Sequence, residues 1–294
     1  MQPRNMDVIQ GQSHLSLITS KGAENSVHEH SKPQYRDRAS ILSLLKSEND
    51  LCKVREMHAY ILKQKMIPKD VYIATALLSK YAKCGALKEC RQVFEQLLVR
   101  DVVSWTALID GYAKHQLFEE SLNCFRKMQE EGVSPDATTY TCILKACGAL
   151  GSLDIGEVID IEVRRRGLLM KHFKLGSALV DMYAKCGALE KAQEVFEQLP
   201  VRNVVSWTSL LTGYAQLGQA KVVLDLFKKM RAEDVMPDTV TFLVLLMACT
   251  HSGLLEEGEI LFDDMCAAYC LTPTHEHYTC MIDLFGRAGH FDKA

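Results

Sequence analysis

The chain has 294 residues, 48% of them hydrophobic, which is enough apolar material to bury a core. Its 34 Lys and Arg residues are outnumbered by 37 Asp and Glu residues, and the formal net charge of −3 excludes a strong overall positive field. No stretch reaches the roughly 18 to 20 apolar residues that a membrane span needs. The eleven cysteines are an odd number in a large chain, which favours reduced thiols over a disulfide framework.

Residues 1–37 are polar and show no helical period, so we expect a flexible leader there. A transit peptide is usually rich in Arg and Ser and poor in acidic residues, whereas this segment contains Asp7, Glu24 and Glu29. The composition of the leader therefore gives weak support for targeting to an organelle.

From residue 38 onwards the chain is built from internal repeats. The segment ALLSKYAKCGAL begins at Ala76 and returns as ALVDMYAKCGAL from Ala178. At the same offset of 102 residues, VFEQLLVRDVVSWTALIDGYA from Val93 returns from Val195 as VFEQLPVRNVVSWTSLLTGYA. A fixed period of this kind is the sequence signature of a repeat architecture.

The block of 102 residues divides into three units of 31, 35 and 36 residues. Turn residues mark the ends of the units, as Gly132 and Pro135 do in the second one. With an earlier unit of the third kind and a partial final unit, the predicted array consists of residues 38–70, 71–101, 102–136, 137–172, 173–203, 204–238, 239–274 and 275–294.

Each unit is expected to form two amphipathic helices. In the unit 102–136, apolar residues recur at helical spacing in two segments that a turn separates. They are Trp105, Leu108, Ile109 and Tyr112 in the first segment and Leu122, Phe125 and Met128 in the second. Such a pair buries its apolar faces only against neighbouring units, so the sequence predicts an all-α, right-handed superhelical α-solenoid of helix-turn-helix units.

Two kinds of repeated residue are expected to serve packing rather than function. Trp105 and Trp207 lie at the centre of the apolar stripe, which favours a place in the core over stacking on a ligand. Four cysteines recur at the same offset, and we expect them to be buried small side chains rather than nucleophiles. They are Cys84, Cys147, Cys186 and Cys249.

The unit lengths, together with VVSWTALIDGYAK, YAKCGALKEC and a terminal SPD, resemble plant pentatricopeptide-repeat (PPR) proteins, in particular the PLS subclass with alternating P, L and S motifs. The resemblance covers residues 38–294. It implies binding of single-stranded RNA, a location in the mitochondrion or chloroplast, and a role as a specificity factor in C-to-U editing. The last stretch, HEHYTCMIDLFGRAGHFDKA, resembles the final S motif before an E/DYW-type extension, so we expect the chain to be truncated before such a region.

A deaminase centre would need H-x-E and P-C-x-x-C motifs around a zinc ion, and neither motif occurs. His275 and His277 have the wrong spacing around Glu276, and three residues separate Cys266 from Cys270. No Ser-His-Asp order or Gly-rich phosphate loop stands out. We therefore expect no catalytic residue, no metal site and no cofactor, with the chemistry supplied by a missing domain or by a partner such as a deaminase-domain or editing-factor protein.

Helical-repeat RNA binders present each unstacked base to two or three side chains of one repeat. The resemblance assigns these roles to the second and fifth residues of the first helix and to the last residue of the unit. It implies base stacking by Val103 and Val205. The base-reading pairs that it implies are Thr75 with Asp101, Thr106 with Asp136, Ser177 with Asn203, and Thr208 with Asp238.

A carboxylate only accepts hydrogen bonds, so beside a hydroxyl it suits guanine, whose edge offers N–H groups. By the family's code the Thr/Asp pairs would read guanine, and Ser177 with Asn203 would read adenine. No base is assigned to the longest units, which carry Thr141 with His172 and Leu243 with Thr274. With the RNA parallel to the protein, the expected core is G-G-N-A-G-N.

Other interpretations remain open from the residues alone. Thr, Ser, Asp and Asn at these places are also ordinary helix-capping residues. A protein-binding scaffold of tetratricopeptide type would stack similar hairpins, although with a uniform period of about 34 residues. The run of Arg164, Arg165 and Arg166 predicts either a local basic surface or a solvated helix face.

Overall fold

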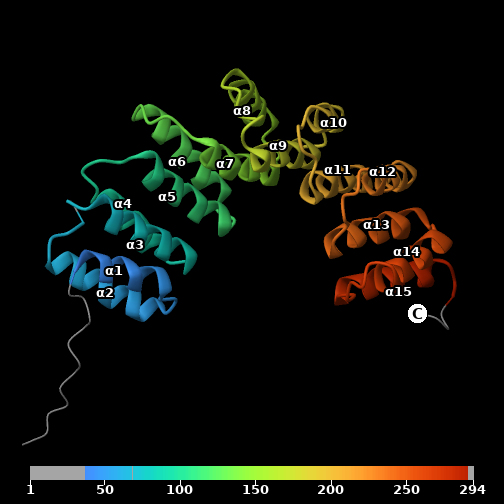
Figure 1. The fold of residues 1–294 in the computed structure, drawn as a ribbon, viewed down its shortest axis with the longest axis horizontal. Coiled ribbons are helices and arrows are strands. Elements are labelled where there is room, and N and C mark those ends of the chain that lie inside the picture. The colour runs from blue at the N-terminus through green and yellow to red at the C-terminus, as the bar shows by residue number, and fades with distance from the viewer. Residues whose placement is uncertain (1–36, 68, 291–294) are drawn as a thin grey trace, which may run out of the picture.

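The structure is a computed structural model that describes residues 37–67 and 69–290. Within these ranges it contains fifteen α-helices and no strand. The helices follow one another along an arch (Figure 1). The leader predicted for residues 1–37 lies, apart from Asp37, outside the described residues. No helix formed by the described ranges has the length and apolar character that a membrane crossing requires.

The helices alternate along the chain as first and second members of helix-turn-helix pairs. Their bounds are α1 Arg38–Ser47, α2 Leu51–Lys63, α3 Val71–Lys83, α4 Leu87–Glu95, α5 Val102–Lys114, α6 Phe118–Glu130, α7 Ala137–Leu150, α8 Leu153–Arg165, α9 Phe173–Lys185, α10 Leu189–Glu197, α11 Val204–Gln216, α12 Ala220–Ala232, α13 Thr239–Ser252, α14 Leu255–Ala267 and α15 His275–Arg287.

The first helices of the pairs form one continuous layer. Each odd-numbered helix from α1 to α13 packs along the next odd-numbered helix. In the described part of the chain the even-numbered helices approach one another through side chains, as in the ion pairs of Arg55 with Glu89 and of Lys191 with Glu157. The odd-numbered helices lie on the concave side of the arch, and α6, α8, α10 and α12 lie on its convex side (Figure 1). Because each unit packs only on its neighbours, the architecture is the predicted α-solenoid.

Caps determine where the inner helices begin and end. An Asp or Asn side chain accepts a hydrogen bond from a backbone N–H three residues further on at the start of α5, α7, α11 and α13. At their other ends, α7 and α13 stop at Gly151 and Gly253, each at a φ of 66°. Glycine adopts this left-handed conformation without the steric cost of a Cβ atom, so both helices end there.

The two tryptophans lie in the core, as predicted. Trp105 and Trp207 are each 2% exposed. They pack edge-on against Phe94 and Phe196, with ring centroids 4.5 Å and 4.6 Å apart. Such pairs contribute about 0.5–1.5 kcal/mol beyond the burial of their area, so they stabilise the contacts of α4 with α5 and of α10 with α11.

Small residues allow neighbouring inner helices to approach closely. A Cβ atom placed on Gly213 of α11 would lie 2.4 Å from Cδ2 of Leu189 and 3.0 Å from Cβ of Ala184. In the preceding block, a Cβ atom on Gly111 of α5 would lie 2.8 Å from Cβ of Ala82. The inner layer therefore has no room for a larger residue at these crossings.

The prediction for the repeated cysteines is right for two of them. Cys147 and Cys249 are fully buried. Cys84 and Cys186 are only partly buried, so the prediction is wrong for these two. Both are the C-cap residues of their helices, α3 and α9, where the chain turns away from the packed layer.

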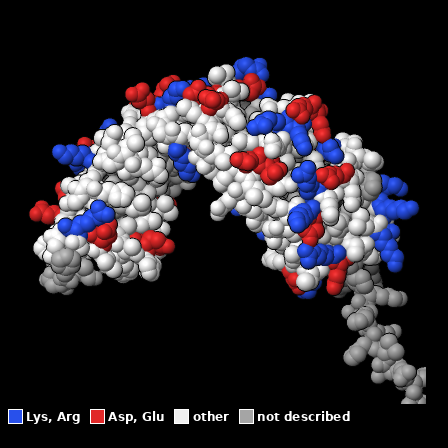
Figure 2. Space-filling model, turned by 180° about the vertical axis from the view of Figure 1, so that it is seen from behind, with Lys and Arg blue, Asp and Glu red and all other residues white. Residues whose placement is uncertain are grey.

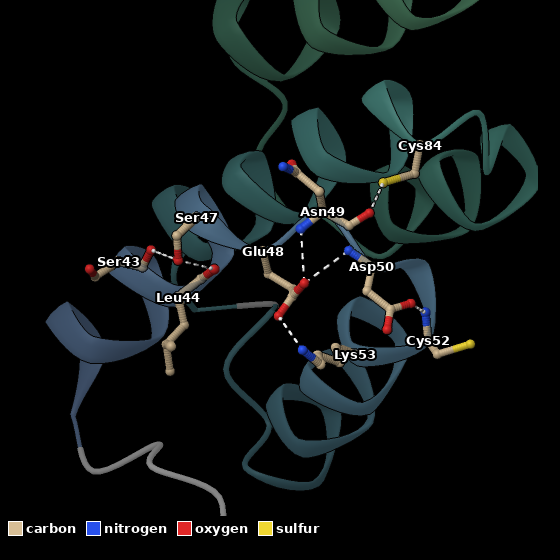
Figure 3. Close-up of polar contacts among 9 residues, drawn as sticks. All are labelled: Ser43, Leu44, Ser47, Glu48, Asn49, Asp50, Cys52, Lys53 and Cys84. Atoms are coloured by element: carbon tan, nitrogen blue, oxygen red, sulfur yellow. Dashed lines mark hydrogen bonds and ion pairs between the residues drawn. The ribbon is translucent and has the colours of Figure 1, made fainter.

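The turn between α1 and α2 is held by polar contacts (Figure 3). Oε1 of Glu48 accepts hydrogen bonds of 2.9 Å from the backbone N–H groups of Asn49 and Asp50, and Nζ of Lys53 lies 3.4 Å from the other carboxylate oxygen. Sγ of Cys84 donates to the carbonyl oxygen of Asn49 at 3.7 Å. The end of α3 is thereby attached to the turn of the preceding unit.

Candidate nucleic-acid interface

The residues expected to contact bases lie on one stripe of each inner helix. Along α5, Val103, Thr106, Asp110 and Lys114 follow one another at spacings of three and four residues, so they share one helix face. Val103 is 55% exposed, and Val205 at the same place on α11 is 57% exposed. Both residues expected to stack on bases are thus available to a ligand.

A hollow of about 630 Å³ lies on this stripe, between α5, α7 and the start of α9. Its walls contain the complete predicted set of the unit 102–136, namely Val103, Thr106 and Asp136. They also contain Thr141 and His172, the corresponding pair of the next unit. The structure therefore brings the predicted residues of two consecutive units into one cavity.

Thr106 and Asp136 are connected through Thr139, the third residue of α7. The Thr139 hydroxyl donates to Oδ1 of Asp136 at 2.9 Å, and its backbone N–H donates to the same oxygen at 2.8 Å. Oγ1 of Thr106 lies 2.7 Å from Oγ1 of Thr139. Since Thr139 donates its hydrogen to Asp136, the hydrogen between the two threonines comes from Thr106.

Because the hydroxyl hydrogen of Thr106 is donated to Thr139, the pair keeps acceptor groups that a ligand in the hollow could use. The remaining lone pairs of the Thr106 hydroxyl can accept hydrogen bonds. The cap uses only Oδ1 of Asp136. The other carboxylate oxygen, Oδ2, takes part in no hydrogen bond among residues 37–67 and 69–290. The pair therefore offers acceptor groups to a ligand.

The same arrangement recurs between α11 and α13. Oγ1 of Thr208 lies 2.9 Å from Oγ1 of Thr241, whose hydroxyl donates to Oδ1 of Asp238 at 2.9 Å. Thr208 is 9% exposed, whereas Thr106 is half-buried. In this unit, Asp238 and the exposed Val205 present more surface to a ligand than the hydroxyl does.

Ser177 and Asn203 contact each other directly. Nδ2 of Asn203 donates to Oγ of Ser177 at 3.1 Å, while Oδ1 of Asn203 accepts the cap bond from the backbone N–H of Ser206 at 3.0 Å. The cap fixes the orientation of the amide, so Nδ2 retains a second N–H group as a donor. Ser177 itself is 4% exposed.

Thr75 and Asp101 form no such connection. Oδ1 of Asp101 accepts from the backbone N–H of Ser104 at 2.8 Å, and the Ser104 hydroxyl donates to the carbonyl oxygen of Asp101 at 2.9 Å. Oγ1 of Thr75 is buried and has no hydrogen-bond partner among the residues that the structure describes. The structure therefore joins three of the four predicted pairs and leaves this one separate.

Three lysines that sequence reasoning did not single out border the hollow. They are Lys145, Lys171 and Lys174, and all three are exposed. None of them forms an ion pair with another described residue, in contrast to Lys114, which is paired with Asp110. The spacing of the stripe could have located Lys145, since it follows Thr141 by one helical turn.

The Arg164 to Arg166 run is a solvated helix face rather than a free basic surface. It lies at the end of α8, in the outer layer, where Arg164 pairs with Asp160, and Arg165 and Arg166 both pair with Glu162. The hydrogen bonds from the two arginines lower the pKa of Glu162 to about 2. Figure 2 shows Lys and Arg side chains next to Asp and Glu side chains over much of one face of the arch.

His277 has a structural role. It is 1% exposed, its Nδ1 lies 2.8 Å from Oγ1 of Thr274, and its Nε2 lies 2.8 Å from the carbonyl oxygen of Thr239. These contacts connect the cap of α15 to the start of α13. In the described ranges no group of three or more His, Cys, Asp or Glu residues could hold a metal ion.

Models of known protein families match most of the residues of the array. The model described as "PPR repeat family" matches residues 100–149 and 202–251. The model described as "PPR repeat" matches residues 72–102, 177–204, 240–270 and 276–294. The chain belongs to the pentatricopeptide repeat family. The matched PPR residues include Val103, Thr106 and Asp136 of the hollow.

Several relatives come from Arabidopsis thaliana. The pentatricopeptide repeat-containing protein At3g28640 is 40% identical over 241 residues, which are 82% of this chain and 48% of that protein. The protein At2g03880, named mitochondrial, is 36% identical over 86% of this chain and 39% of its own length. The protein At1g08070, named chloroplastic, is 37% identical over 90% of this chain and 36% of its own length. This PPR chain therefore spans less than half the length of each of these relatives.

A solved structure shares the fold. The pentatricopeptide repeat protein PPR10, in complex with an 18-nt psaJ RNA element, matches with a TM-score of 0.73 and 16% sequence identity. The match covers 87% of this chain and 39% of that chain. The expectation of a solenoid of PPR units is thereby confirmed.

Proposed function

We propose that this PPR array binds single-stranded RNA sequence-specifically along the concave stripe of its inner helices. The observation that carries the proposal is the hollow between α5, α7 and α9, which Val103, Thr106 and Asp136 line together. An exposed apolar side chain beside polar acceptors suits an unstacked base, which has an apolar face and a polar edge. The fold shared with PPR10, whose structure contains an 18-nt RNA element, supports the same ligand class.

The direction of the hydrogen bonds supports guanine at the unit 102–136. The Thr106 hydroxyl and Oδ2 of Asp136 both act as acceptors, because the hydrogen of Thr106 goes to Thr139. The Watson–Crick edge of guanine offers two adjacent N–H donors, whereas that of adenine offers one donor and one acceptor. Thr208 with Asp238 repeats these contacts and is assigned to guanine as well. Thr75 with Asp101 is assigned to guanine by the code of the family alone.

A different base is assigned to the unit 173–203. Since the cap occupies Oδ1 of Asn203, its Nδ2 supplies a donor, which matches the acceptor nitrogen of the adenine edge. The proposed RNA core is therefore G-G-N-A-G-N, in which the units 137–172 and 239–274 take the unassigned positions. The starts of α3, α5, α7, α9, α11, α13 and α15 at residues 71, 102, 137, 173, 204, 239 and 275 support the division into units.

The finer assignment is that the chain is a PLS-type specificity factor for C-to-U editing of organellar transcripts. Relatives named mitochondrial and chloroplastic support a location in one of these organelles. In this role the array contributes RNA binding and no catalytic step. The deamination would be carried out by a deaminase domain or an editing-factor partner.

A binding competition tests the proposal. Single-stranded RNA with the core G-G-N-A-G-N is compared with RNA in which the four purines are replaced by pyrimidines, at one fixed salt concentration. We expect the purine RNA to bind at least about tenfold more tightly, which corresponds to about 1.4 kcal/mol. A double-stranded form of the same RNA serves as control, because its Watson–Crick edges are already paired. Equal affinity for both single strands would defeat the proposal and favour a protein-binding scaffold.

A further inference from the structure

We propose that Lys145, Lys171 and Lys174 form a phosphate anchor that holds the RNA backbone at the hollow between α5, α7 and α9. This inference rests on the proposed binding of RNA. It adds that the array binds the RNA backbone through lysines of its first block of 102 residues, and that the second block has no lysines at the equivalent positions. The chemical class of the ligand group is the phosphodiester of a single strand.

The first support is the position of the three charges. Lys145 lies on α7 one helical turn beyond Thr141, Lys171 precedes His172, and Lys174 is the second residue of α9. All three side chains line the cavity that contains the proposed base readers of two units. A strand whose bases enter this cavity brings its phosphates near these exposed lysines.

The second support is that these charges have no partner within the protein. Lys114 and Lys185, on the same stripes, are paired with Asp110 and Asp181. The ion pairs found between described residues include none of the three anchor lysines. Three cations around one cavity repel one another, and an anion placed between them relieves this repulsion.

The carboxylates that line the same hollow do not neutralise the anchor. Asp110 is held by Lys114, and Asp136 caps α7 through Oδ1. Oδ2 of Asp136 is assigned to the edge of a base, which is an N–H donor rather than an anion. The lining of the hollow therefore supplies both acceptors for the edge of a base and, for the backbone, cations that are unpaired among the described residues.

The third support is an internal comparison. The residues 102 positions after Lys145, Lys171 and Lys174 are Met247, Pro273 and Glu276, and none of these is basic. Both blocks nevertheless form the same order of helices, with α13 and α15 in the places of α7 and α9. The order of the helices therefore does not depend on the lysines, and the second block serves as an internal control for their role.

The test compares two variants with the same change of charge. In the first, Lys145, Lys171 and Lys174 are each replaced by Gln. In the second, the exposed outer residues Lys127, Lys221 and Lys229 are each replaced by Gln. The affinity for the purine RNA and for the pyrimidine-substituted RNA is measured between about 50 and 200 mM salt. Thermal unfolding of both variants verifies that the fold is intact.

We expect the inner triple variant to lose at least about tenfold in affinity for both RNAs at the lowest salt concentration. The slope of log K against log salt should become less steep by about 2, because each phosphate contact on a single strand contributes about 0.7. The outer triple variant should leave the slope nearly unchanged. A change that is equal in both variants would reflect net charge alone and would overturn the anchor.

Two further outcomes are informative. A loss restricted to the purine RNA would assign the lysines to base reading and overturn the anchor while the proposed function stands. If the unaltered chain fails to bind RNA, the proposed function falls together with the anchor. As a gain-of-function measurement, Met247→Lys combined with Glu276→Lys should steepen the salt slope by about 1.4, and an unchanged slope would contradict the anchor.

Discussion

The hydroxyl oxygens of Thr106 and Thr139 lie 2.7 Å apart and join the fifth residue of one inner helix to the third residue of the next. Thr139 donates in turn to Asp136, which caps the second helix. The capping interpretation and the base-reading interpretation of these residues therefore do not compete. One carboxylate oxygen of Asp136 starts a helix, and the other is available to a ligand.

Substitutions at Asp136 separate capping from base reading. Asn203 forms the same kind of cap, so Asp136→Asn should change the free energy of unfolding by less than about 0.5 kcal/mol. It should also move the preference at that nucleotide from guanine towards adenine by about 1–3 kcal/mol. Asp136→Ala should lose about 1 kcal/mol of stability as well as the preference. Urea unfolding and RNA competition measure the two effects, and an Asn variant that still prefers guanine would disprove the reading role.

The hydroxyl of Thr106 is expected to select the base together with Asp136. By the code of the family, Thr106→Asn should shift that unit from guanine towards uracil by about 1–3 kcal/mol. Competition among RNAs that differ only at this nucleotide measures the shift. Thr272→Asn, in the exposed loop before α15, is the matched control and should change no preference. If the nucleotide preference of the Thr106 variant equals that of the control, Thr106 only links the two helices.

The close crossing of α9 and α11 predicts a stability effect. Gly213→Ala would place a Cβ atom 3.0 Å from Cβ of Ala184 and 2.4 Å from a methyl group of Leu189. We expect a loss of about 1–3 kcal/mol in the free energy of unfolding, because an overpacked interface must shift. Gly286→Ala in α15 is the control, since nothing lies within 4 Å of its added Cβ atom. It should be neutral or stabilising by up to about 1 kcal/mol, and equal losses in both variants would refute the crowding argument.

Burial predicts which thiols react. Desolvation raises the pKa of the Cys90 and Cys147 thiols to about 12. Only the thiolate is nucleophilic, so both groups stay protonated and unreactive as the pH rises from 7 to 9. The exposed Cys52, Cys266 and Cys270 should react rapidly with a disulfide reagent in the native protein. Mass spectrometry of modified peptides measures the rates, with urea-unfolded protein as the control in which all eleven cysteines react. Rapid native labelling of Cys147 would show that the inner layer opens.

The sequence by itself determined the helices, their order and their starts. Apolar spacing of three and four residues, Gly and Pro at the ends, and Asp or Asn before an inner helix are local signals that act within one unit. The placement of Trp105 and Trp207 in the core followed from the same periodicity. The positions of the candidate readers were implied by the family resemblance, which places them at fixed distances from a helix start.

The tertiary structure alone decided how these residues interact between units. It connected Thr106 to Asp136 through Thr139, left Thr75 without a partner among the described residues, and assembled Lys145, Lys171 and Lys174 around one hollow. It also paired the arginines of α8 with acidic neighbours. These contacts depend on how one inner helix packs against the next. Periodicity specifies which face of a helix is inward, but only packing sets the distance and register between the side chains of neighbouring helices.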